Sequence, residues 1–85
     1  MSEMHDELQD VELCIQFSDF DGTPNLIREV PLKFIPRAGD YLNVSKEGMT
    51  YFLNVDDITH HIDCDTSRHT ITINGELKNS YARNL

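Results

Sequence analysis

Residue types that bind zinc are concentrated in one stretch of the sequence, which holds His60, His61, Cys64 and His69. Their spacing matches no standard zinc motif. Adjacent histidines on a strand also point to opposite faces, so His60 and His61 cannot both serve one site without distortion. We therefore expect no bound metal and no cofactor, and we keep a small zinc-binding domain built on His60, Cys64 and His69 as an alternative.

Asp56-Asp57 lies close to His60 in the sequence and could act as an acid/base group. Catalysis also requires a pocket and a positioned partner, and a chain of 85 residues has little room for either. Cys14 could be a reactive thiol, but its apolar sequence neighbours would not activate it. We expect no catalytic residues and no enzyme activity.

The charge balance restricts the classes of partner. Fifteen acidic residues against seven basic ones give a formal net charge of −8, which repels phosphate backbones, so we expect no direct contact with nucleic acid.

The sequence has no apolar run long enough to span a membrane, and its first residues are acidic where a secretory signal is basic. We expect no membrane contact and a cytoplasmic location. In that reducing compartment Cys14 and Cys64 should be free thiols.

Short β-strands must position these groups. The clearest strand is 11–18, where apolar and polar residues alternate. Asp21-Gly22 predicts a turn into a second strand over 26–34, which Pro31 should bend or split. Gly48 predicts the turn of a second hairpin. The strands expected from this hairpin onwards are 41–45, 49–63 and 69–73.

Apolar side chains change face within the long strand of the second hairpin. Tyr51, Leu53 and Val55 lie at odd positions, whereas Ile58 and Ile62 lie at even positions. Since side chains alternate along a regular strand, we predict a β-bulge at Asp56-Asp57 that lets Val55 and Ile58 both face the core.

The same bulge determines the face to which each following side chain points. His60 should face inward or lie at the mouth of a barrel, Ile62 should face inward, and His61 and Asp63 should face water.

The chain is predicted to be mainly β, a single domain over 11–74. We expect a small five-stranded antiparallel SH3-like barrel with a bent strand at 51–63, and an OB-type barrel is the alternative. Residues 1–10 should form a flexible acidic arm. Residues 75–85 begin at the glycine of the Asn74-Gly75 pair and should form a loose tail or one helical turn.

One family resemblance rests on turn residues. The pattern resembles small uncharacterised bacterial and phage proteins in which an Ile-Pro-Arg-x-Gly-Asp turn leads into a β-hairpin. The matching positions are the segment 34–41, Gly48, Tyr51, Val55 and the segment 58–63. The resemblance implies a small β-barrel fold, and it implies no activity, substrate or cofactor.

These observations favour a non-enzymatic protein–protein interaction module. Its partner would be another protein, or a second copy of the chain paired through a strand edge. One alternative is an acidic inhibitor, phage-encoded as the resemblance allows, that mimics nucleic acid to block a nucleic-acid-handling protein. The residues predicted to form the interaction surface are Arg37, Asp40, Asp56, Asp57 and His61.

Overall fold

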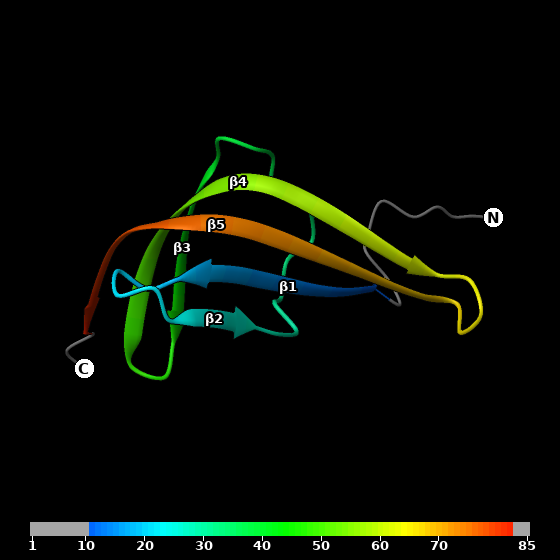
Figure 1. Cartoon of the computed structure of the whole chain (residues 1–85), viewed down its shortest axis with the longest axis horizontal. Helices are drawn as coiled ribbons and strands as arrows, with labels where there is room; N and C mark the ends of the chain where they lie inside the picture. The colour runs from blue at the N-terminus through cyan, green and yellow to red at the C-terminus, as the bar shows by residue number, and fades with distance from the viewer. Residues whose placement is uncertain (1–10, 83–85) are drawn as a thin grey trace.

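The computed structural model describes residues 11–82, which form a single five-stranded sheet (Figure 1). The strands are β1 (Val11–Ser18), β2 (Pro24–Ile27), β3 (Tyr41–Lys46), β4 (Met49–Asp63) and β5 (Arg68–Ala82). The predicted acidic arm at 1–10 lies outside the described residues. The described part of the chain contains no helix long and apolar enough to cross a membrane.

The sheet is mixed and open. Its strand order is β2-β1-β5-β4-β3. All neighbouring strands are antiparallel except β1 and β5, which run parallel with Val11 opposite His69. The two outermost strands, β2 and β3, do not pair with each other. The expectation of a closed antiparallel barrel, whether SH3-like or OB-type, is therefore wrong, while the mainly β class and the five strands are confirmed.

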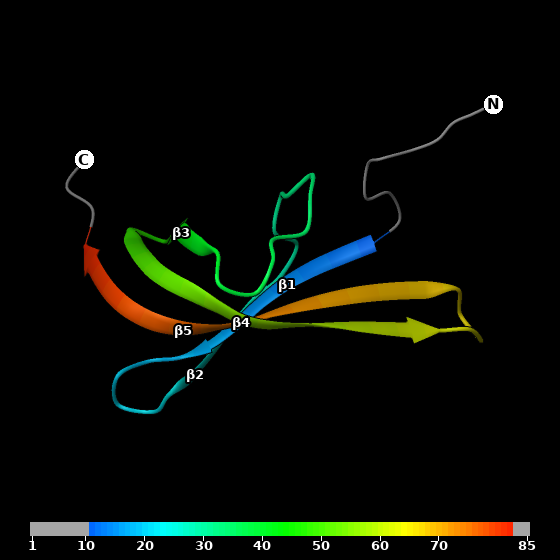
Figure 2. The same ribbon diagram turned by 90° about the horizontal axis from the view of Figure 1, so that it is seen from above.

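The bulge predicted in β4 is confirmed. Val55 pairs with Gly75 and Asp57 pairs with Asn74, so Asp56 is an extra residue without a partner in β5. Val55 is buried, and Ile58 packs half-buried against the same core cluster. A second register shift lies between Phe52 and Leu53. Bulges bend strands, and β4 and β5 both curve along their length (Figure 2).

For residues 75–82 the expectation of a loose tail or a helical turn is wrong, because β5 continues to Ala82, and residues 83–85 lie outside the described residues. Gly75 does not make a turn. It lies in the strand opposite Val55, where an added Cβ would be 3.4 Å from the Cβ of Leu53. Leu77 is buried in the core, and its burial holds this part of β5 on the sheet.

The core lies on one face of the sheet, which we call the core face. Its buried members are Leu13, Ile15, Phe17, Leu53, Val55, Ile71, Ile73 and Leu77. The segment between β2 and β3 covers part of this face through Val30, Leu32 and Ile35. The second strand was expected over 26–34 with a bend or split near Val30-Pro31, but β2 ends at Ile27, before that point. Glu29 adopts a φ of 55°, which breaks the extended backbone there.

The hairpin between β3 and β4 is confirmed. Lys46 pairs with Met49, so the loop has two residues, Glu47 and Gly48. Both have positive φ, 53° and 83°, as a type I′ turn requires. This turn matches the twist of the strands and fixes the register in which Leu42 and Val44 pack against the core.

Candidate functional site

The far end of the β4–β5 hairpin is the least covered part of the sheet. β3 pairs with β4 only as far as Asn54, and β2 pairs with β1 only from Ile15 onwards. Beyond these points the sheet has three strands, β1, β5 and the second half of β4 (Figure 1). We call this part the three-stranded end. Its outer edge, residues 57–63 of β4, pairs with no other strand among the described residues.

The core face is incompletely covered at the three-stranded end. Register places Val11, His60, Ile62 and His69 on this face, in line with the buried Ile71. The side chain of Ile62 is 64% exposed, so the expectation that it faces inward into a core is wrong. His60 is exposed at the uncovered end of the core face, and His61 is exposed on the opposite face, as expected.

Two histidines meet on this uncovered face. His60 Nδ1 lies 2.9 Å from His69 Nε2, within hydrogen-bonding distance, and the ring centroids are 5.2 Å apart. Cys64 lies in the exposed turn between β4 and β5. No group of three or more potential metal ligands is found in residues 11–82. The structure thus brings together two of the three residues considered for zinc.

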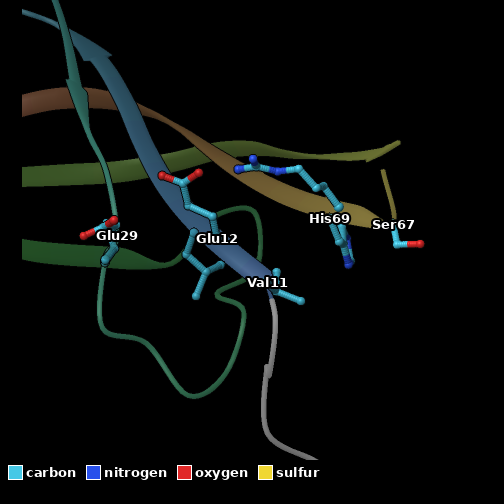
Figure 3. A pocket seen from close by; sticks show the side chains of 8 residues that line it. Val11, Glu12, Glu29, Ser67 and His69 are labelled. Atoms are coloured by element: carbon cyan, nitrogen blue, oxygen red, sulfur yellow. The ribbon is translucent and has the colours of Figure 1, made fainter. Parts of the chain in front are cut away.

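An open hollow of about 510 Å³ lies beside His69. Figure 3 shows Glu29 on one side of it, His69 and Ser67 on the other, and Val11 between them. Ser67 belongs to the β4–β5 turn and has a φ of 58°. The hollow is therefore formed where the start of β1, the segment after β2 and the start of β5 come together.

The opposite face of the sheet, which we call the polar face, carries a second shallow depression of about 430 Å³. Arg28 donates two hydrogen bonds of 2.9 Å to the Glu12 carboxylate. The hydrogen bond from Arg28 lowers the pKa of Glu12. Residues from four strands and their connections line the depression: Glu12, Cys14, Gln16, Leu26, Arg28, His61, Asp63, Arg68, Thr70 and Thr72.

Cys14 lies at the floor of the polar face and is buried. Burial raises the pKa of its thiol, and the nearby Glu12 carboxylate raises it further. A raised pKa leaves little thiolate at neutral pH, so Cys14 is poorly suited to nucleophilic chemistry. Sequence reasoning missed the Glu12–Arg28 pair that covers it. Alternation along 11–18 and 26–34 would have placed both residues on polar faces, but their contact depends on the register between the strands.

The predicted surface residues fall into two groups. Arg37 and Asp40 form a tight turn, in which the Arg37 amide donates to Asp40 Oδ2 at 2.8 Å. This turn is bonded to Val55 by two backbone hydrogen bonds, so it lies next to the bulge residue Asp56. Asp40 therefore caps the turn.

Asp57 and His61 belong to the polar side of the free β4 edge. Asp57 Oδ1 accepts a hydrogen bond of 2.6 Å from the Asn74 side chain. Asp63, two residues after His61, accepts hydrogen bonds from the backbone N–H groups of Asp65 and Thr66. These bonds lower the pKa of Asp63, and the bond from Thr66 has the largest effect. Asp63 was expected to face water and is half-buried in this turn.

No protein-family model, no curated protein and no solved structure matches this chain. The resemblance to small bacterial and phage proteins therefore stays a prediction, and function has to be inferred from the geometry.

Proposed function

We propose that the chain is a non-enzymatic protein-interaction module that binds an extended segment of its partner along the free edge of β4. The observation that carries this proposal is the outer edge at residues 57–63, which pairs with no other strand within residues 11–82 and lies next to the exposed Ile62. Exposed backbone N–H and C=O groups on such an edge are a template for an added strand.

The edge carries only part of the protection that soluble proteins usually give a free strand. Natural edges carry charged residues, above all lysine, or proline, or are bent away by bulges. Residues 57–63 contain no lysine and no proline, their acidic residues stand at the two ends of the stretch, and the bulge at Asp56 precedes it. The middle of the edge, from Ile58 to Ile62, holds β-branched residues, which favour an extended partner.

The turn at 37–40 defines where the partner segment would start. Its backbone bonds to Val55 occupy the outer edge of β4 up to the bulge. A partner strand would therefore pair from Asp57 onwards, with Arg37 and Asp40 at one end and His61 along its polar side. Asp57 and Asp63 are acidic, and the chain has a net charge of −8, so the preferred partner segment is basic with alternating apolar residues.

Lysine substitution on the edge tests the proposal. Ile62→Lys places a charge at the edge, whereas Leu26→Lys on β2, an exposed residue of the outermost strand on the other side of the sheet, is the matched control. Affinity purification from the native source should recover a partner with the wild type and with Leu26→Lys but not with Ile62→Lys. Sedimentation over a concentration series tests in the same way whether wild type and variant self-associate.

Absence of any reproducible partner, together with a monomer at high concentration, would contradict the proposal. Retention of the partner by Ile62→Lys would also contradict it. Binding that is competed by DNA or RNA and lost in high salt, equally for both variants, would instead support the acidic-inhibitor alternative.

A further inference from the structure

His60 and His69 lie diagonally across the β4–β5 ladder. His60 pairs with Ile71 and His69 pairs with Ile62, so the two imidazoles come from positions two residues apart in register and project from the same face. Diagonal neighbours in a sheet are within reach of each other when the side chains are long. Here the two side chains are in contact, since His60 Nδ1 and His69 Nε2 are 2.9 Å apart.

This separation matches two adjacent positions around a metal ion. Imidazole nitrogens bind divalent metals at about 2.0–2.1 Å, so two nitrogens at a right angle are about 2.9 Å apart, and two at a tetrahedral angle are about 3.3 Å apart. The 2.9 Å separation of the hydrogen-bonded nitrogens equals the right-angle value, so a metal at that angle can replace the bond without moving the two nitrogens apart. Square-planar and tetragonal sites with nitrogen and oxygen ligands favour Cu²⁺ or Ni²⁺ over Zn²⁺.

We propose that His60 Nδ1 and His69 Nε2 chelate one Cu²⁺ or Ni²⁺ ion across β4 and β5. Without metal the 2.9 Å contact is a hydrogen bond, in which one of the two nitrogens carries a proton. On metal binding that imidazole takes its other neutral tautomer, so that both ligating nitrogens present a lone pair to the metal. The ring planes are tilted by 32°, and the two side chains must rotate for the lone pairs to converge on one point. Water completes the coordination.

The surroundings are compatible with a cation. His60 is exposed and His69 is half-buried, so a metal can enter without rearrangement of the core. Arg68 is adjacent in sequence to His69 but projects to the opposite face, because side chains alternate along β5. The site differs from the zinc alternative, since it needs neither Cys64 nor a third protein ligand.

Copper titration followed by electron paramagnetic resonance tests the site. Because His5 lies outside the described residues and the exposed thiol of Cys64 would reduce Cu²⁺, all proteins should carry His5→Gln and Cys64→Ser. This parent should bind one Cu²⁺ per chain with nitrogen splitting from two imidazoles. His60→Gln or His69→Gln should weaken binding at least about tenfold, because the second ligand then no longer acts intramolecularly. His61→Gln is the control and should leave the affinity unchanged.

Thermal unfolding gives a readout of the paired strands. Since the two histidines meet only when β4 and β5 are paired, Cu²⁺ should raise the melting temperature of the parent and not of His69→Gln. The proposal is overturned if His60→Gln binds Cu²⁺ as the parent does, if the spectrum shows one nitrogen, or if His61→Gln loses binding as much as His60→Gln.

Discussion

Deletion of Asp56 should be tolerated better than deletion of Asn54, although the two residues are separated only by Val55. Asp56 is the extra residue of the bulge. When it is removed, Val55 and Asp57 become consecutive opposite Gly75 and Asn74, which are already consecutive. The ladder becomes regular and no core-facing side chain changes face. The cost is limited to the local bend of the strand.

Deletion of Asn54 has a different effect. Val55 then takes the position of Asn54 and faces away from the core, and the Asp56 side chain takes the place of Val55. Val55 is 1% exposed, so its lost burial costs about 1.5 to 3 kcal/mol. The carboxylate of Asp56 on the core face adds a further penalty. The two deletions should therefore differ by at least about 1.5 kcal/mol in the free energy of unfolding.

Urea denaturation followed by far-ultraviolet circular dichroism measures this difference, because the chain has no tryptophan. A domain of this length has a total stability of about 4 to 13 kcal/mol, so both variants should give a measurable transition or, for the Asn54 deletion, partial loss of the folded state. Equal destabilisation by the two deletions, or a larger loss on deletion of Asp56, would refute the bulge as the reason for the change of face.

Three further predictions concern single side chains. Ile73→Ala, at a position with 0% exposure, should cost about 2 to 5 kcal/mol in the same urea experiment. In the native protein a thiol reagent should modify the exposed Cys64 rapidly and the buried Cys14 only slowly, and Cys64→Ser should abolish the fast phase. Asp63→Asn should lower stability at neutral pH, because the carboxylate accepts two backbone N–H groups that lower its pKa below 3.8. A carboxyl whose pKa is lower in the folded state stabilises the fold at pH values above its unfolded-state pKa. The free energies of unfolding of wild type and Asp63→Asn should therefore converge as the pH falls from about 4 through the lowered pKa of Asp63, which a pH series of unfolding curves would measure.

Local patterns were sufficient for the elements that depend on neighbours in sequence. Alternation defined β1 at Val11–Ser18, Gly48 located the second hairpin, and the change of parity after Val55 located the bulge. The second half of β5 was missed because Asn74-Gly75 is typical of a turn. A signal was present, however, since Leu77 continues the alternation of Ile71 and Ile73.

Features that depend on distant parts of the chain were not predictable in the same way. Nothing local in β1 specifies that its neighbour is β5 in a parallel arrangement. Ile62 is apolar, and alternation along β4 places it on the core face, but its exposure depends on how far the segment between β2 and β3 covers that face. His60 and His69 share a face by parity, yet their contact depends on the register of β4 against β5.

The parallel pairing of β1 with β5 has a consequence for how the chain folds. Val11 pairs with His69 and Gln16 with Asn74, so each contact of this ladder joins residues separated by most of the described chain. β3, β4 and β5 form a meander of consecutive hairpins, whose local contacts can form early during synthesis. β1 must wait for β5 to be made, with its core-facing side chains exposed until then. Docking of the β1–β2 hairpin on the completed meander should therefore be the slow step, and the nascent chain is most vulnerable to aggregation just before it.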